Sequence, residues 1–144
     1  MSWGVFRESL NDGVGNFAFS QTLPMAVGVN AKINIGLGDF DGDGDIDFIG
    51  VASSGVSSLY LNQGGLQGGT PGVFSSLIPT AITGFPKDLV VGDVDGDGDL
   101  DVVAMGSSTQ PVYLNDGSGN FTQFTNSPAI GFGLGAALGD LDGD

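Results

Sequence analysis

Two stretches of the sequence carry five aspartates each at alternate positions: GDFDGDGDID at residues 38–47 (loop 1) and GDVDGDGDLD at residues 92–101 (loop 2). A third and shorter copy, GDLDGD, occupies residues 139–144 (loop 3). Two like charges about 4 Å apart repel by about 1 kcal/mol in water and by several times more near a protein surface. Because so many carboxylates would destabilise a tight turn, the pattern predicts a cation among them.

The available ligands indicate which cation this is. The sequence contains no histidine and no cysteine, so every side-chain ligand would be an oxygen, and oxygen ligands suit a hard cation. Ca²⁺ accepts about six to eight oxygens in a flexible geometry, whereas Mg²⁺ requires a strict octahedron and keeps its waters. The loops therefore predict calcium, with two complete sites and a third that is incomplete.

The spacing assigns a role to each aspartate when the first one is counted as position 1. We expect side-chain ligation from positions 1, 3, 5 and 9 and a backbone carbonyl ligand from position 7, whose side chain points outward. Glycine at position 6 permits the sharp turn. The expected ligands are Asp39, Asp41, Asp43, Asp45 and Asp47 in loop 1, Asp93, Asp95, Asp97, Asp99 and Asp101 in loop 2, and Asp140, Asp142 and Asp144 in loop 3. Since loop 3 supplies positions 1, 3 and 5 only, we expect it to bind calcium more weakly.

The loops do not form EF-hands. An EF-hand requires a bidentate glutamate at position 12 and flanking helices. Position 12 is Gly50 in the first copy and Ala104 in the second, and both flanks have the pattern of strands.

Charge and composition exclude several classes of partner. The formal net charge is −14, most of it in the three loops, and the chain has only three lysines and arginines. A basic surface for nucleic acid cannot be assembled from so few cations, so we expect no nucleic-acid partner. No stretch approaches the ~18 apolar residues of a membrane span, and the first residues show no signal peptide.

A repeat of roughly 50 residues positions the loops. Apolar residues alternate before each loop, as at Ile33, Ile35 and Leu37, and a short β-branched run follows, such as IDFIGVA at 46–52. Next come SLYLN at 58–62 or PVYLN at 111–115, a Gly-rich turn, and a further strand starting at Phe74 or Phe121. About four antiparallel strands per unit are typical of β-propeller blades.

We therefore expect an all-β chain forming one repeat domain over residues 1–144. Its blade-equivalents are approximately 1–31 (partial), 32–84, 85–132 and 133–144 (the start of a further unit). About three blade-equivalents cannot close a ring, because propellers have about four to eight blades. We expect either a fragment of a longer protein or copies that associate through open blade edges to complete the ring.

At this point the residues show a family resemblance. GDFDGDGDIDFIGVA followed by LYLN, and GDVDGDGDLDVVAM followed by VYLNDGSGNF, resemble the FG-GAP/VCBS-type repeat. That resemblance implies a calcium-binding β-propeller, as in integrin α-subunit heads, some lectins and many bacterial surface proteins. It also implies that the D-x-D-x-D-G-x-x-D aspartates named above hold Ca²⁺, and that the protein is located outside the cell or at its surface.

Three functions remain open from the sequence. The first is a non-enzymatic, calcium-stabilised module for binding, adhesion or surface scaffolding of a protein or carbohydrate ligand. The second is a carbohydrate-binding lectin, with the candidate contacts Trp3, Tyr60, Tyr113, Asn62 and Asn115, although the tyrosines also follow the apolar period of packed strands. The third is an accessory part of a polysaccharide-acting enzyme. Because a chain without His and Cys has neither a Ser-His-Asp triad nor a thiol nucleophile, we expect no catalysis by this chain itself.

Overall fold

The structure is a computed structural model that describes residues 4–25, 32–64, 70, 72–75, 78–83, 86–106, 110–125, 135 and 137–139. These residues form ten strands and no helix, so the prediction of an all-β fold is confirmed for this part of the chain. Within this described part no helix is long and apolar enough to cross a membrane.

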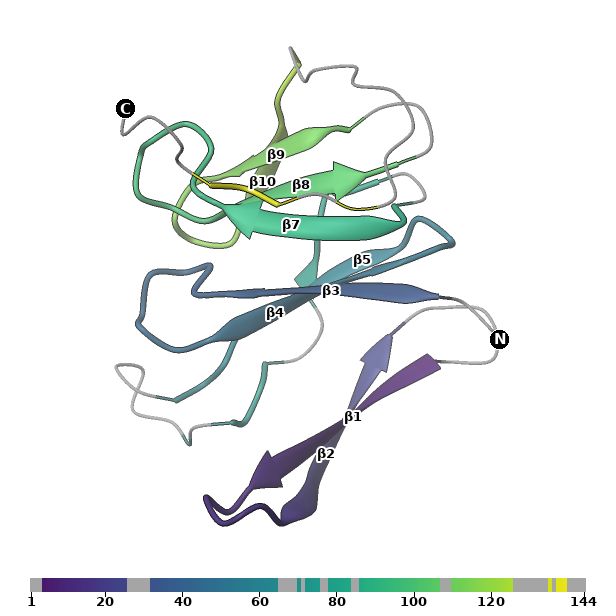
Figure 1. Cartoon of the computed structure of the whole chain (residues 1–144), viewed down its shortest axis with the longest axis vertical. Coiled ribbons are helices and arrows are strands. Elements are labelled where there is room, and N and C mark those ends of the chain that lie inside the picture. The colour runs from purple at the N-terminus through teal and green to yellow at the C-terminus, as the bar shows by residue number, and fades with distance from the viewer. Residues whose placement is uncertain are drawn as a thin grey trace.

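The strands form three antiparallel sheets that follow one another along the chain (Figure 1). The first is a hairpin of β1 (Gly4–Asn11) and β2 (Phe17–Met25). The second has the order β3 (Ile33–Gly38), β4 (Asp47–Ala52), β5 (Ser57–Tyr60) and β6 (Ile78–Pro79). The third runs β7 (Asp88–Gly92), β8 (Asp101–Met105), β9 (Val112–Asn115) and β10 (Phe121–Gln123). The predicted four-stranded antiparallel units are therefore present.

One predicted strand start is wrong. The fourth strand of the second sheet does not begin at Phe74, which makes only an isolated bridge with Asn62. Instead β6 pairs with β5 a few residues later, at Leu59↔Ile78. The longer connection after Asn62 displaces the strand, whereas in the third sheet the short turn places β10 at Phe121 as predicted.

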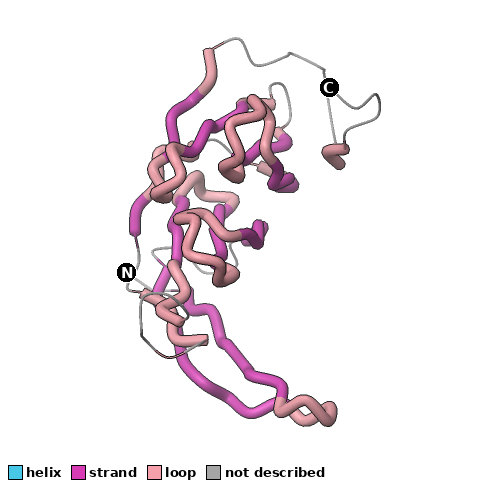
Figure 2. The backbone as a smooth tube through the Cα atoms, turned by 90° about the vertical axis from the view of Figure 1, so that its left-hand side faces the viewer, coloured by secondary structure: helices cyan, strands magenta, loops and turns pink. Residues whose placement is uncertain are grey.

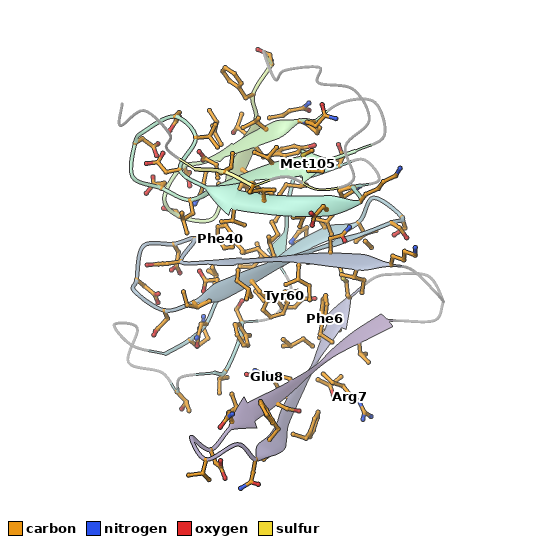
Figure 3. All side chains as sticks on the ribbon, in the orientation of Figure 1. Phe6, Arg7, Glu8, Phe40, Tyr60 and Met105 are labelled. Carbon is orange, nitrogen blue, oxygen red and sulfur yellow. The ribbon has the colours of Figure 1, made fainter. Side chains whose placement is uncertain are left out.

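The sheets stack face to face, and the core lies between them (Figure 3). Ile49, Val51 and Leu59 of the second sheet pack against side chains of the third sheet, with Phe40 in the same cluster. On the opposite face of the second sheet, Phe48 and Tyr60 pack against residues of the β1–β2 hairpin. This alternation is what strands buried on both faces produce, because successive side chains point to opposite faces.

The stack is elongated, with the hairpin at one end (Figure 2). Loops 1 and 2 are the hairpin loops that join the first two strands of the second and third sheets. They lie on the same side of the stack, at the left of Figure 1. The last strand pairs before the loops are Gly38↔Asp47 and Gly92↔Asp101. The sheet register therefore places position 9 of each loop at the start of the returning strand.

Candidate metal centres

Loop 1 is folded around the carboxylate of Asp39. The N–H of Asp43 donates to Asp39 Oδ1 (3.1 Å) and the N–H of Gly44 donates to Asp39 Oδ2 (2.8 Å). The Asp43 carboxylate in turn accepts the N–H of Asp45 at 2.9 Å. Gly42 and Gly44 have φ angles of 74° and 90°, which only glycine adopts without strain. The loop is thus tightly coiled, and its backbone N–H groups already stabilise part of its negative charge.

Asp47, at position 9, closes the loop from the buried side. Its Oδ2 accepts the N–H of Phe40 (2.8 Å), and its Oδ1 accepts the N–H of Asn62 (2.7 Å). The side chain is fully buried. One carboxylate therefore joins the beginning of the loop, the start of β4 and the chain after β5.

Loop 2 repeats this arrangement. The N–H groups of Gly96 and Gly98 donate to the two oxygens of Asp93 at 2.7 and 3.0 Å. Asp101 accepts the N–H of Val94 (2.8 Å) and that of Asn115 (2.9 Å), as Asp47 does from its own two partners. The same sequence pattern therefore builds a similar local structure twice, although the second donor to the first aspartate is Asp43 in loop 1 and Gly96 in loop 2.

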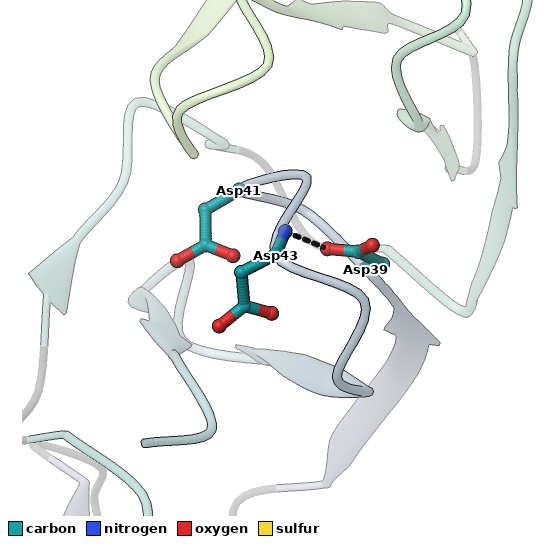
Figure 4. Close-up of side chains that lie close together, drawn as sticks. All are labelled: Asp39, Asp41 and Asp43. Carbon is teal, nitrogen blue, oxygen red and sulfur yellow. Dashed lines mark hydrogen bonds between the residues drawn. The ribbon is translucent and has the colours of Figure 1, made fainter. Parts of the chain in front are cut away.

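The loops bring carboxylates close enough to share a cation. One oxygen from each of Asp39, Asp41 and Asp43 lies within 4.8 Å of the others (Figure 4). The same holds for Asp93, Asp95 and Asp101 in loop 2. In loop 1, Asp43 Oδ2 and Asp45 Oδ2 are buried and have no hydrogen-bond partner. Buried anionic oxygens without a partner are costly, so this donor set fits a bound cation.

Burial and mutual repulsion act on the protonation of these groups. Burial raises the pKa of Asp47 to about 6, helped by the charges of Asp41 and Asp43, although its two N–H donors act in the opposite direction. Desolvation also raises the pKa of Asp95 and of Asp99, and neighbouring carboxylates add to both shifts. Burial is thus the first cause of each raised pKa, and repulsion between the carboxylates adds to it.

The structure differs from the sequence prediction at Asp45. We expected its side chain to point outward, but it is only partly exposed and its Oδ2 is buried. Asp97 and Asp99 belong to the second loop but lie outside its closest group of three. Asp140, Asp142 and Asp144 of loop 3 lie outside the described residues, so their predicted weaker site stays a prediction.

The tyrosines considered as sugar contacts are buried packing residues. Tyr60 stacks on Phe48, with ring centroids 4.5 Å apart, and its hydroxyl donates to the carbonyl of Pro24. The Tyr113 hydroxyl donates to the carbonyl of Thr83 (3.2 Å). The packing interpretation is therefore confirmed for both. Trp3 lies outside the described residues.

The two asparagines shape the turns and hold adjacent segments together. Asn62 Oδ1 accepts the N–H of Gly72 at 3.0 Å, and Asn115 Oδ1 accepts the N–H of Gly119 at 3.1 Å. Asn115 Nδ2 also donates to the carbonyl of Phe40 in the preceding unit (2.8 Å). Sequence reasoning missed this link between units. The only feature of the sequence that could have indicated it is the asparagine that follows each Tyr-Leu pair.

The fold and the loops together define an all-β repeat protein with propeller-like, four-stranded blades. The sequence model of the FG-GAP-like repeat matches the chain at residues 39–104 and again at residues 93–144, which together span more than half of it. The chain therefore belongs to the FG-GAP-like repeat family. No curated protein and no solved structure matches it.

Proposed function

We propose that this chain is a calcium-stabilised β-propeller repeat module that serves binding, adhesion or surface scaffolding without catalysis. The observation that carries the proposal is the pair of buried, unpartnered oxygens on Asp43 and Asp45, inside a loop whose carboxylates lie within reach of one cation. A hard divalent cation satisfies such oxygens better than solvent, which does not reach them.

The residues of loop 1 that would hold the ion are Asp39, Asp41, Asp43 and Asp47, with the carbonyl or the buried Oδ2 of Asp45. In loop 2 they are Asp93, Asp95, Asp97 and Asp101, with a carbonyl from Asp99. When bound, the ion supplies positive charge that offsets carboxylate repulsion and pins the first two strands of each blade. Because an unfolded chain offers no such preformed cluster, binding contributes directly to the free energy of folding.

We place this module outside the cell or at its surface. Extracellular calcium modules bind with dissociation constants of about 10⁻⁴–10⁻³ M, and carboxylate loops at the surface of a domain suit that range. A role as an adhesion or scaffold surface requires no reactive side chain, and the sequence has no His or Cys nucleophile. A protein or a carbohydrate can be the ligand of such a surface.

Calorimetric titration with Ca²⁺ tests the metal proposal. We expect Asp43→Asn to weaken binding at loop 1 by about tenfold or more, which is about 1.4 kcal/mol. The matched control is Asp12→Asn, which removes one negative charge from an exposed turn of the β1–β2 hairpin and leaves the loops unchanged. The proposal fails if the unaltered chain binds no Ca²⁺, or if both variants weaken binding equally.

A glycan array and a polysaccharide hydrolysis assay, each run with Ca²⁺ and with EDTA, test the class of ligand and the proposed lack of catalysis. Calcium-dependent retention of one class of sugar would specify a lectin role for the module. Hydrolysis by the purified chain would contradict the absence of catalysis.

A further inference from the structure

Asn115 of the third sheet is hydrogen-bonded to both candidate metal loops. Its backbone N–H donates to Oδ1 of Asp101, which is position 9 of loop 2, at 2.9 Å. Its side-chain Nδ2 donates to the carbonyl of Phe40 in loop 1 at 2.8 Å. Its Oδ1 accepts the N–H of Gly119 at 3.1 Å, which fixes the orientation of the amide. Because Asn115 is only 5% exposed, solvent hardly competes for these three hydrogen bonds.

Phe40 is the other end of this connection, and it stands between positions 1 and 3 of loop 1. Its N–H donates to Oδ2 of Asp47 at 2.8 Å, while its carbonyl accepts the hydrogen bond from Asn115. The Phe40 side chain is fully buried and packs on an aromatic ring of β10, so its backbone cannot shift without moving the core. A continuous series of hydrogen bonds therefore joins the position-9 carboxylates of the two loops through Phe40 and Asn115.

The turn that follows Asn115 also lies between the two loops. A Cβ atom on Gly42 of loop 1 would lie 3.8 Å from the carbonyl oxygen of Gly117. A Cβ atom on Gly117 would in turn lie 2.6 Å from Oδ2 of Asp99 in loop 2. Both loops thus rest against one turn of the third sheet, so a shift of either loop changes the surface on which the other packs.

Asn62 occupies the same position one unit earlier, but its side-chain amide is used differently. Its N–H donates to Asp47 and its Oδ1 accepts the N–H of Gly72, which matches two of the three hydrogen bonds of Asn115. Its Nδ2, however, donates to the carbonyl of Ile46 at 3.2 Å, within loop 1 itself. In the part of the chain that the structure describes, the connection between loops is therefore made by Asn115, and Asn62 provides a matched control.

We infer that Asn115 couples the two calcium sites, so that an ion bound in either loop strengthens binding in the other. The inference rests on the proposed function, since it concerns ions held by loops 1 and 2. Ligation by positions 1 and 3 of loop 1 fixes Phe40, which lies between them, and ligation by Asp101 fixes the acceptor of the Asn115 N–H. Whichever site is filled first orders the shared contact, so the second site is already partly ordered when its ion binds. The coupling factor is the same in both directions.

Calorimetric titration of three versions of the full chain with Ca²⁺ measures the coupling. All carry Asp142→Asn, which disables loop 3 and leaves two sites to compare. One keeps loops 1 and 2, and the others lose loop 2 through Asp95→Asn or loop 1 through Asp43→Asn. We expect the product of the two dissociation constants in the two-loop chain to be about fivefold smaller than the product from the single-loop chains. This excess persists in about 0.5 M salt, because salt screens the direct effect of one ion's charge on the other site but not these hydrogen bonds.

Substitution of the two asparagines tests the route of the coupling. Asn115→Ala removes the side-chain donor to Phe40 and keeps the backbone N–H, and we expect it to abolish the fivefold excess. The matched control Asn62→Ala removes an amide at the equivalent position and keeps the excess. Urea unfolding in EDTA reports whether both variants fold. If Asn115→Ala does not fold, Asn115→Asp keeps the acceptor for Gly119, lacks the amide donor, and is expected to abolish the excess as well.

The outcomes separate this inference from the proposed function. Equal products of dissociation constants mean independent sites, which would overturn the inference and leave calcium binding by the loops standing. An excess that survives in the Asn115 variants, that is lost equally in Asn62→Ala, or that disappears in salt would also overturn it. A purely structural role of Asn115 lowers the free energy of unfolding in EDTA and leaves the excess unchanged. A chain that binds no Ca²⁺ in either loop would overturn the proposed function together with the inference.

Discussion

Loops 1 and 2 have nearly the same sequence and similar internal hydrogen bonds, but their surroundings differ. In both loops the first aspartate accepts N–H groups from the turn, and the last one accepts two more. Yet the second residue of loop 1, Phe40, is fully buried, whereas its equivalent Val94 is 42% exposed. The aspartates Asp93, Asp95 and Asp97 are likewise more exposed than their counterparts in loop 1.

The difference comes from the next unit along the chain. Phe40 packs edge-on against Phe121, with ring centroids 5.7 Å apart, and its carbonyl accepts a hydrogen bond from Asn115. No such cover for Val94 is present among the described residues. Contacts within a unit therefore set the shape of each loop, and the following unit sets its burial.

The largest expected effect comes from removing that cover. Phe40→Ala leaves a cavity between two sheets, and we expect it to destabilise the chain by about 3–5 kcal/mol. Val94→Ala in loop 2 changes an exposed side chain, and its effect should stay below about 0.5 kcal/mol. Urea unfolding in EDTA measures both free energies without a contribution from metal, and equal losses would contradict the comparison.

A smaller loss of stability, similar in the two loops, is expected when the aspartate at position 9 is replaced. Asp47→Ala and Asp101→Ala each leave two backbone N–H groups without an acceptor, which we expect to cost about 1–3 kcal/mol in either loop. The same unfolding experiment in EDTA compares them. If one variant were strongly destabilising and the other neutral, the two loops would not share the internal architecture described above.

The smallest effect concerns pH. The pKa of Asp47 is raised from 3.8 to about 6 by burial, so the native metal-free chain takes up a proton before the unfolded chain does. Its stability should therefore increase by about 1–2 kcal/mol as the pH falls from 7 towards 4, and be lost again as the pH rises through 6. The lowered pKa values of Asp12 and Asp116 have the opposite sign, but they act below pH 3.8.

Urea unfolding of the metal-free chain at several pH values checks this expectation. Asp47→Asn removes the titrating carboxyl and should flatten the change near pH 6. In calcium the dependence reverses, because protons compete with the ion for the same oxygens. A metal-free chain whose stability rises steadily from pH 4 to 7 would contradict the raised pKa.

Much of the fold could be predicted from the sequence, because the pattern of each strand in the repeating unit occurs more than once along the chain. Alternation at Ile33, Ile35 and Leu37 predicted β3, and the β-branched run before Met105 predicted β8. The displaced strand β6 could not be predicted, since a long Gly-rich connection leaves the register of the following strand undetermined. Strand pairing fixed it at Leu59↔Ile78 instead.

The grouping of the aspartates in each loop could be predicted from the sequence, but the burial of the two loops could not. The spacing of the aspartates was enough to group Asp39, Asp41 and Asp43, because a tight turn has to bring them together. It could not show that Phe40 and Val94, at the same position of two similar loops, have different burial. That depends on contacts with Phe121 and Asn115, which lie far away in the sequence.

Thermal unfolding in calcium, in magnesium and in EDTA tests the central claim most directly. If the aspartate loops bind Ca²⁺ and thereby stabilise the blades, saturating calcium at about a hundred times the dissociation constant adds about 2.7 kcal/mol for one site. We expect this to raise the midpoint by at least about 5 °C over EDTA, with a smaller rise in magnesium. Superimposable unfolding curves in all three conditions would contradict it.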